Sequence, residues 1–198
     1  LEDRVERQRI YMAWLTTSMY TPGDSELDLV GDMLANGKTA RLYKTLVYER
    51  RVALDVSAAQ QSREMAGYFV LAVTAAPGAS LTDIAAAVDE EIARLAAEGP
   101  TSAEMERAEA QAEANFVYHL QTVGGFDGKS DQLNAYNVLR GDPGFFAKDL
   151  DRYRQATPES VRAAAQQYLR PDRRVVLSVV PRGRATDALP GSEPVGVS

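Results

Sequence analysis

The sequence predicts an α+β fold in which one largely antiparallel β-sheet carries helices on one of its faces. Three observations predict it. Two apolar strand patterns in the middle of the chain, the first of them alternating, are joined by a short polar connection, as in a hairpin. Further strand patterns lie near the two ends of the chain, and the helical patterns are grouped instead of alternating with strands. With 198 residues, 45% of them hydrophobic, the chain can bury one sizeable core.

The first expected elements are a strand and two helices. Residues 8–17 have apolar side chains on both strand faces, which indicates cover on at least part of both sides. Asp24 or Ser25 is expected to cap a helix that ends at Asn36-Gly37, because asparagine followed by glycine is a common helix stop. A second helix is expected from about Thr39 to Arg51.

The middle of the chain is expected to form a hairpin and a long helix. The two strands cover residues 52–60 and 67–75, and residues 61–66 are the polar connection between them. Apolar residues at spacings of three and four then predict an amphipathic helix over residues 81–98. Gly99-Pro100 stops it.

The C-terminal part is expected to be mainly helical. Thr101 and Glu104 fit a capping box, in which the hydroxyl and the carboxylate each accept a backbone N–H at the start of a helix. Helices are expected over residues 101–123, 131–139, 145–154 and 158–169, followed by a strand over residues 174–180.

These elements are interpreted as one domain of residues 1–181. Residues 182–198 have little to bury, so we expect a disordered tail there. Because the sequence starts at Leu1 with a charged segment and no initiator methionine, we expect it to be part of a longer protein. The side chains expected in the core are Trp14, Leu42, Leu46, Val56, Phe69, Leu71, Ile84, Val88 and Val176.

Composition excludes several classes of function. A net charge of −6 with scattered basic residues gives no electrostatic case for nucleic-acid binding. No apolar stretch reaches the length of a membrane helix, so no membrane partner is expected. The absence of cysteine excludes disulfides, thiolate zinc sites and cysteine nucleophiles.

The sequence also lacks the usual hydrolytic constellations. A catalytic zinc site needs several converging histidines or carboxylates, and His119 is the single histidine, so we interpret it as structural. No Gly-x-Ser-x-Gly elbow is present. Gly37-Lys38-Thr39 lacks the earlier glycine and the preceding strand of a phosphate loop. The glycine-rich residues 124–129 are interpreted as a helix break, with a loop that lines a substrate chamber or a partner contact as the alternative.

Several segments together resemble a known family. Residues 35–57, in which Asn36-Gly37 separates two helices and a strand follows at once, resemble the signature of the C-terminal, non-zinc half of the M16 peptidases, the pitrilysin and insulinase family. Residues 77–81 and 99–108 are similar to the boundaries of the family's long helix. Gly141-Asp142-Pro143, with the following segment up to Pro181, resembles its C-terminal run.

This resemblance implies a non-catalytic domain that faces an HxxEH zinc domain and encloses with it a chamber in which an unfolded peptide is cut. It places zinc in that partner domain, in the same parent chain or in a partner subunit, and no cofactor in this chain, which alone is expected to be inactive. The alternatives are a purely structural assembly module and an unrelated α+β binding domain. Bacterial relatives favour an extracytoplasmic location, periplasmic or secreted.

The resemblance also indicates candidate site residues. In the family, an arginine near the end of the second helix and a tyrosine at the start of the next strand hold the substrate. The matching positions here fall on Val47 or Tyr48 and on Leu54, while Arg50 and Arg51 lie close but out of register. We therefore treat Tyr48, Arg50, Arg51 and Leu54 as facing a substrate or partner, and the departure from the family pattern favours a role as chamber wall or scaffold over direct clamping.

Overall fold

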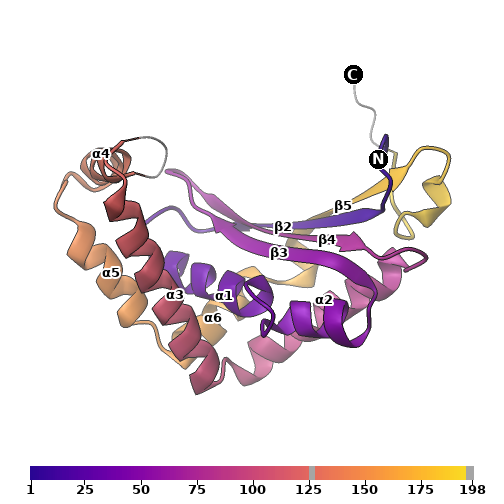
Figure 1. Ribbon diagram of the computed structural model, residues 1–198, viewed down its shortest axis with the longest axis horizontal. Helices are drawn as coiled ribbons and strands as arrows, with labels where there is room; N and C mark the ends of the chain where they lie inside the picture. The colour runs from indigo at the N-terminus through magenta and orange to yellow at the C-terminus, as the bar shows by residue number, and fades with distance from the viewer. Residues whose placement is uncertain (125–127, 195–198) are drawn as a thin grey trace.

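A single five-stranded sheet organises the protein, in a computed structural model that describes residues 1–124 and 128–194. The order of the strands is β1-β5-β2-β4-β3, and every neighbouring pair is antiparallel except β1 with β5. Helices α1, α2 and α6 lie across one face of this sheet, and α3, α4 and α5 stand at one end of it. None of the described helices crosses the other face, here called the bare face (Figure 1). The α+β prediction of one largely antiparallel sheet with helices on one face is confirmed.

The elements follow the predicted order. The strands are β1 (Glu2–Asp3), β2 (Arg9–Thr16), β3 (Ala53–Gln61), β4 (Gly67–Ala75) and β5 (Arg174–Pro181). The longer helices are α1 (Asp24–Ala35), α2 (Leu81–Glu98), α3 (Ser102–Gln121), α4 (Lys129–Arg140), α5 (Phe146–Arg154) and α6 (Pro158–Tyr168). A π-helix, η1 (Tyr43–Glu49), precedes β3, and the 3₁₀ turns η2 (Pro171–Arg173) and η3 (Ala185–Asp187) flank β5. None of the described helices is both long and apolar enough to cross a bilayer.

The π-helix corrects the continuous helix predicted over residues 39–51. Only Arg41 and Leu42 precede it in α conformation, and the N–H of Arg50 then donates to the carbonyl of Thr45, five residues back. A π turn adds a residue to each hydrogen-bonded ring, so it shifts the faces of the helix relative to a 3.6-residue repeat. Leu46 stays fully buried in this arrangement, whereas Tyr48 points outward.

The start of α1 is a second correction. Neither Asp24 nor Ser25 is the cap. Gly23 holds that position with a left-handed backbone (φ 94°), and its N–H donates to the carboxylate of Glu26 at 3.1 Å. Glycine adopts this conformation without the strain a side chain would add. The carboxylate of Asp24 is thereby available for contacts with other elements.

The core lies between the sheet and the helices. Ile10, Met12 and Trp14 of β2 are buried on the helix side, whereas Leu15 on the bare face is 76% exposed, so the cover expected on both faces of this strand is lacking there. All the predicted core residues are buried except Val176, which is 37% exposed. The error has a topological cause: β1 pairs only with the last two residues of β5, so Val176 lies at a sheet edge.

The segment after Pro181 continues along this edge. Gln8 donates a hydrogen bond to Asp187 at 2.7 Å, and the N–H of Leu189 donates to the Ser178 hydroxyl while its side chain packs against the core. The boundary at Pro181 and the disordered tail 182–198 stay predictions, and these contacts argue for ending the domain later. Residues 195–198 lie outside the described part of the chain.

Candidate functional site

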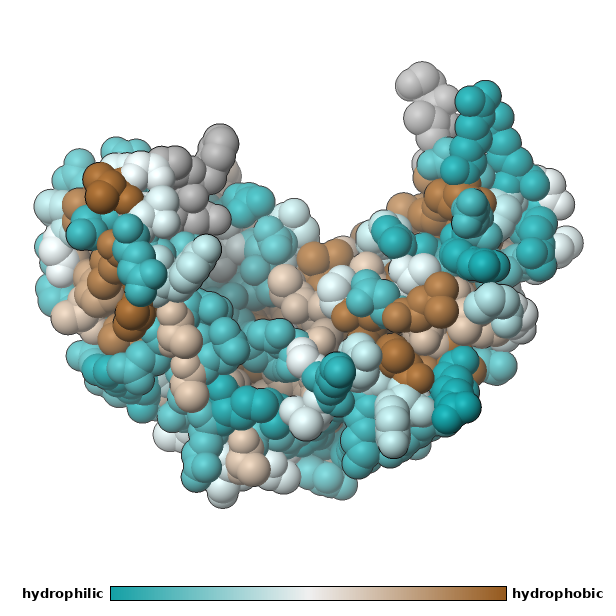
Figure 2. All heavy atoms as spheres, in the orientation of Figure 1, coloured by the Kyte–Doolittle hydropathy of each residue, from teal (hydrophilic) through white to brown (hydrophobic). Residues whose placement is uncertain are grey.

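The bare face of the sheet is largely apolar. By strand register, Tyr11, Ala13 and Leu15 of β2 lie beside Tyr68, Val70 and Ala72 of β4 on one side and Val175, Leu177 and Val179 of β5 on the other. Leu15 and Val175 are 76% and 72% exposed. Figure 2 shows hydrophobic surface along this hollowed side of the molecule. A sheet face of this composition is typical of a surface that another protein layer covers.

Helices α3, α4 and α5, here called the arm, stand at one end of this hollow (Figure 1). The foot of α3 is fixed by the predicted capping box, in which Thr101 accepts from the N–H of Glu104 and the Glu104 carboxylate accepts from the N–H of Thr101. Arg41 adds a bidentate ion pair to Glu104, at 2.6 and 2.8 Å. Burial would raise the pKa of Glu104, but the hydrogen bonds from Arg41 and Thr101 outweigh it and lower that pKa to about 2.

A buried polar network joins the arm to α1. Arg152 of α5 bridges Asp24 of α1, at 3.1 Å, and Asp149, at 2.8 Å. The hydroxyl of the fully buried Tyr136 of α4 donates to the second oxygen of Asp149 at 2.7 Å. Because each of these buried carboxylates has a cation or a donor, the network fixes the angle between arm and body without leaving a charge unpaired. Sequence periodicity alone did not reveal it.

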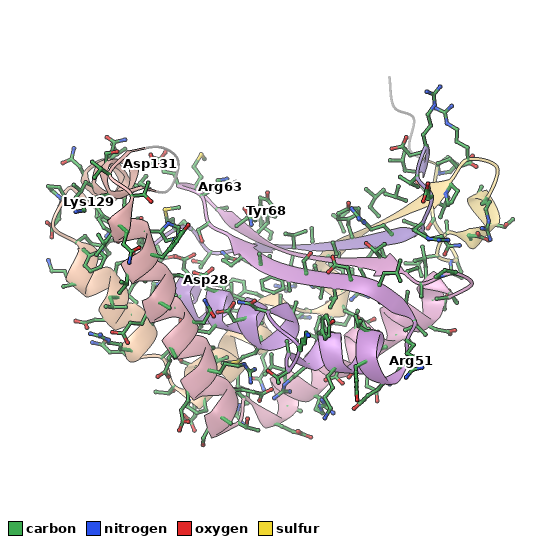
Figure 3. All side chains as sticks on the ribbon, viewed as in Figure 1. Asp28, Arg51, Arg63, Tyr68, Lys129 and Asp131 are labelled. Carbon is green, nitrogen blue, oxygen red and sulfur yellow. The ribbon has the colours of Figure 1, made fainter. Side chains whose placement is uncertain are left out.

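A cavity of about 620 Å³, here called the corner cavity, lies where the arm meets the sheet. Residues of α1, α3, α4, α5, β3 and the loop before α1 line it. The polar lining includes Asp28 and Asp32 of α1, His119 of α3 and Asp131 of α4. Figure 3 shows Asp28 low beside α3 and Asp131 at the top of the arm.

Two of these carboxylates are electrostatically unusual. Burial, opposed by a 2.6 Å hydrogen bond from the Tyr153 hydroxyl, raises the pKa of Asp28 to about 7. Burial also raises the pKa of Asp32, against a hydrogen bond from Asn36 and the nearby charge of Arg107. Both aspartates therefore hold protons more tightly than an exposed aspartate does.

The predicted site residues lie at the opposite end of β3 from the arm. Tyr48 is 73% exposed at the end of η1, and Leu54 is 52% exposed where β3 has a bulge against β4. Arg50 is held by Glu90 of α2 at 2.8 Å. Arg51, at the passage from η1 to β3, has a left-handed backbone with φ 53°, a strained conformation for arginine (Figure 3). The four residues lie within one short segment of the chain, and none of them lines the corner cavity.

Sequence reasoning missed the corner cavity. The available signal was the spacing of Asp24, Asp28 and Asp32, which places three carboxylates one turn apart on a helix that is otherwise mostly apolar. His119 was noticed as a lone histidine, and its position at this cavity was not anticipated. Across residues 1–124 and 128–194, no three His, Cys, Asp or Glu side chains are grouped so that they could hold a metal ion.

Three solved structures illustrate the fold. A protease from Helicobacter pylori has a TM-score of 0.78 at 15% identity, over 89% of this chain and 42% of that one. A proposed zinc protease from Bordetella pertussis Tohama I has a TM-score of 0.75 at 22% identity, over 88% of this chain and 94% of that one. The periplasmic protease PqqL from Escherichia coli has a TM-score of 0.68 at 18% identity, over 92% of this chain and 20% of that one.

This chain therefore spans less than half of two of these proteins and nearly all of the third. No curated protein matches the sequence. The family model described as "Peptidase M16 inactive domain" matches residues 1–112, which is more than half of the chain and includes β2, α1, η1, β3, β4, α2 and the start of α3. The chain belongs to the M16 peptidase family, as one of its inactive domains.

Proposed function

We propose that this chain forms the non-catalytic wall of the peptide chamber of an M16 zinc metallopeptidase, opposite an HxxEH zinc domain. The observation that carries the proposal is the match to the family's inactive domain in a chain with a bare, apolar sheet face. That face is hollowed and is bounded at one end by the arm. It exposes large apolar side chains, which in the isolated chain are in contact with water.

The division of labour follows from the residues. A zinc hydrolase needs a metal that polarises the peptide carbonyl and activates water, and we assign that metal to the partner domain. This chain contributes a surface that receives the peptide and excludes bulk water. An unfolded peptide is the substrate class that such a chamber suits. An extracytoplasmic location is part of the proposal, supported by the likeness to a periplasmic protease.

The proposal is tested by reconstitution. The HxxEH domain, taken from the parent chain or from a neighbouring gene product, is purified with and without this chain, and cleavage of a quenched-fluorescence peptide is measured. We expect no turnover from this chain alone, slow turnover from the zinc domain alone and a large gain when the two associate.

The outcomes separate the rival functions. Stable association with no gain in cleavage would identify an assembly module. No association with any HxxEH domain of the same genome would overturn the chamber proposal altogether. Turnover that persists in the isolated chain and is abolished by changing one of its own residues would also overturn it.

A further inference from the structure

The corner cavity is strongly biased in charge. Three aspartates, Asp28, Asp32 and Asp131, line it, and no lysine or arginine is among the described residues that do so. Elsewhere the buried carboxylates have a guanidinium at contact distance: Asp24 and Asp149 pair with Arg152, Glu104 pairs with Arg41 and Glu91 pairs with Arg94.

Asp28 departs from this rule. Within the described chain it makes no ion pair, and its hydrogen-bond partner is the neutral hydroxyl of Tyr153, which donates to Oδ2. Arg152 acts on it only from beyond contact distance. A carboxylate in such surroundings is costly to ionise, and a cation that entered the cavity would remove that cost. Asp28 is therefore the strongest attachment point that the cavity offers.

The rest of the lining suits an amphipathic guest. Leu29 of α1, Phe116 of α3 and Ala58 of β3 form apolar wall between the acidic groups. A long basic side chain has the same division, with methylene groups along its length and N–H donors at its end. Asp28 and Asp32 lie one helical turn apart on α1 and Asp131 lies across the cavity on α4, so the acids are spread over several walls.

This spread argues against a bare metal ion. An ion such as calcium needs six to eight oxygens at 2.3–2.6 Å, roughly converging on one point. No such convergence exists among the described acids and the histidine. An ammonium or guanidinium group carries several donors that point in different directions, so it can engage separated carboxylates.

We propose that the corner cavity binds the side chain of a lysine or arginine from a peptide held in the chamber, at the sheet edge that β3 forms. The inference rests on the proposed function, because it names the residue class that this chamber wall selects. Its direct partner is Asp28, and Asp32 and Asp131 add to the negative field. A peptide segment with a basic residue would then be held with that residue at the arm end of the chamber.

Direct binding to this chain tests the inference without the partner domain. The chain has its own contiguous core and covers 94% of a relative solved at nearly the same length, so it is suitable as an isolated protein. The probes are blocked alanine-rich pentapeptides that carry lysine, norleucine or glutamate at the central position. Amide and carboxylate NMR shifts report both the affinity and the place of binding.

We expect the lysine peptide to bind about tenfold or more tightly than the norleucine peptide, which matches its length and lacks its charge. The glutamate peptide should not bind. The shifts should centre on Asp28, and bound lysine should lower the pKa of its carboxyl. Equal affinities for lysine and norleucine, or shifts that centre elsewhere, would overturn the inference. Tighter binding of calcium than of the lysine peptide would point to a metal site and would overturn it too.

Variants distinguish binding in the corner cavity from a general attraction of the acidic protein for cations. Asp28→Asn and Asp32→Asn remove charge inside it, and Asp83→Asn removes one exposed charge from the first turn of α2. We expect Asp28→Asn to abolish the preference for lysine, Asp32→Asn to reduce it several-fold and Asp83→Asn to leave it unchanged. If Asp28→Asn kept the full preference in a protein that unfolds cooperatively and melts no earlier than the wild type, the assignment would be wrong.

Affinity should also depend on pH. Asp28 must be ionised to hold a cation, so with its pKa near 7 the affinity should rise several-fold between pH 6 and pH 8. His119 also lines the cavity, so His119→Gln serves as the control and should keep the rise. The groups that face Asp28 are Asp24 and Asp32 of α1, His119 of α3, Asp131 of α4, Arg152 and Tyr153 of α5, and Tyr20.

Failure of this inference and failure of the proposed function give different results. If the reconstituted enzyme cleaves norleucine and lysine peptides alike, the chamber role stands and the basic-residue site falls. If the isolated chain prefers lysine but never enhances an HxxEH domain, the site stands and the chamber role falls.

Discussion

At the scale of single residues, the charge on Asp28 has a predictable effect on stability. Its pKa is about 7 in the folded protein, whereas 3.8 is the ordinary value that the unfolded chain should show. Between these two values the folded state binds more protons than the unfolded state, so the free energy of unfolding falls as pH rises from about 4 through 7. Asp32 and Asp149, whose pKa values burial also raises, act with the same sign.

Asp28→Asn should therefore make stability less dependent on pH. Asparagine keeps an oxygen that can accept from Tyr153 and resembles the protonated acid in shape. We expect the variant to be as stable as the wild type near pH 5 and more stable by about 1–3 kcal/mol at pH 8. Urea unfolding at both pH values measures this. A variant that is less stable than the wild type at pH 8 would show that the ionised carboxylate is favourably solvated.

Leu46 is the clearest packing test. Its side chain is fully buried beneath η1, so Leu46→Ala should lower the free energy of unfolding by about 2–5 kcal/mol, through lost burial and a new cavity. Tyr48, two residues later, is 73% exposed, and Tyr48→Ala should change stability by under about 0.5 kcal/mol. Equal effects of the two substitutions would mean that the π turn does not set the faces of this helix.

At the scale of elements, α1 packs unusually close to β3. A Cβ placed on Gly31 would lie 3.1 Å from the carbonyl oxygen of Ala58 and 3.4 Å from the Cα of Ala59. Both neighbours are backbone atoms of a paired strand, which cannot turn aside as a side chain can. The glycine thus brings α1 against the strand that forms one wall of the corner cavity.

Gly31→Ala should consequently destabilise the protein, although alanine normally favours a helix. The gain in helix propensity is about 1 kcal/mol, and we expect overpacking to exceed it, for a net loss of about 1–2 kcal/mol. Thermal unfolding of this variant, with Ala93→Gly on the exposed side of α2 as a propensity control, tests the balance. A rise in melting temperature for Gly31→Ala would show that α1 moves away from the sheet at little cost.

Elements with local signals could be predicted from the sequence. The ends of α2 and β4 match the prediction, because Gly99-Pro100 stops the helix and the polar residues 61–66 precede the apolar strand. The π turn of η1 could not be predicted, since the spacing of the buried Leu42 and Leu46 fits an ordinary α-helix as well. The prediction that Val176 is buried was wrong, because its burial depends on whether β1 is long enough to pair beside it.

The candidate functional residues also fall into a group that the sequence could indicate and a group that it could not. The candidate residues from Tyr48 to Leu54 belong to one continuous segment, so a family pattern could indicate them. The corner cavity joins Asp28, His119 and Asp131, which are about a hundred residues apart at the extremes and meet only after the arm docks on α1. No local pattern reports that docking, because it depends on Arg152 reaching Asp24 from a distant helix.

At the scale of the whole molecule, the C-terminal segment fastens the two ends of the chain together. Gln8 donates to the carboxylate of Asp187, the N–H of Gly183 donates to the carboxylate of Glu2, and Leu189 packs against the core. A chain that ends at Pro181 should therefore be less stable than the full chain by about 1–2 kcal/mol, from the lost burial of Leu189 and its neighbours. Urea unfolding of the two lengths checks this. No difference would support a tail that is disordered from residue 182.

The bare face supplies the last prediction, which concerns assembly. Leu15 and Val175 are exposed in the isolated chain and occupy neighbouring strands on this face. Replacing both with aspartate should change the free energy of unfolding by less than about 1 kcal/mol, because neither side chain has much burial to lose. In the assembled peptidase the same change puts two charges into a surface that we expect the chamber to shield from bulk water, where an unpaired charge is unfavourable.

We therefore expect the double variant to fold normally and to weaken association with the zinc domain, or peptide binding by the assembly, by tenfold or more. Ala93→Asp, on the exposed side of α2 in the helical layer, is the matched control and should leave both unchanged. Analytical ultracentrifugation measures the association, and KM for a quenched peptide measures the binding. If the double variant left association and peptide binding as unchanged as the control does, the bare face would lie outside the assembly. The helical side, which is the other broad face of the molecule, would then be the surface to test (Figure 1).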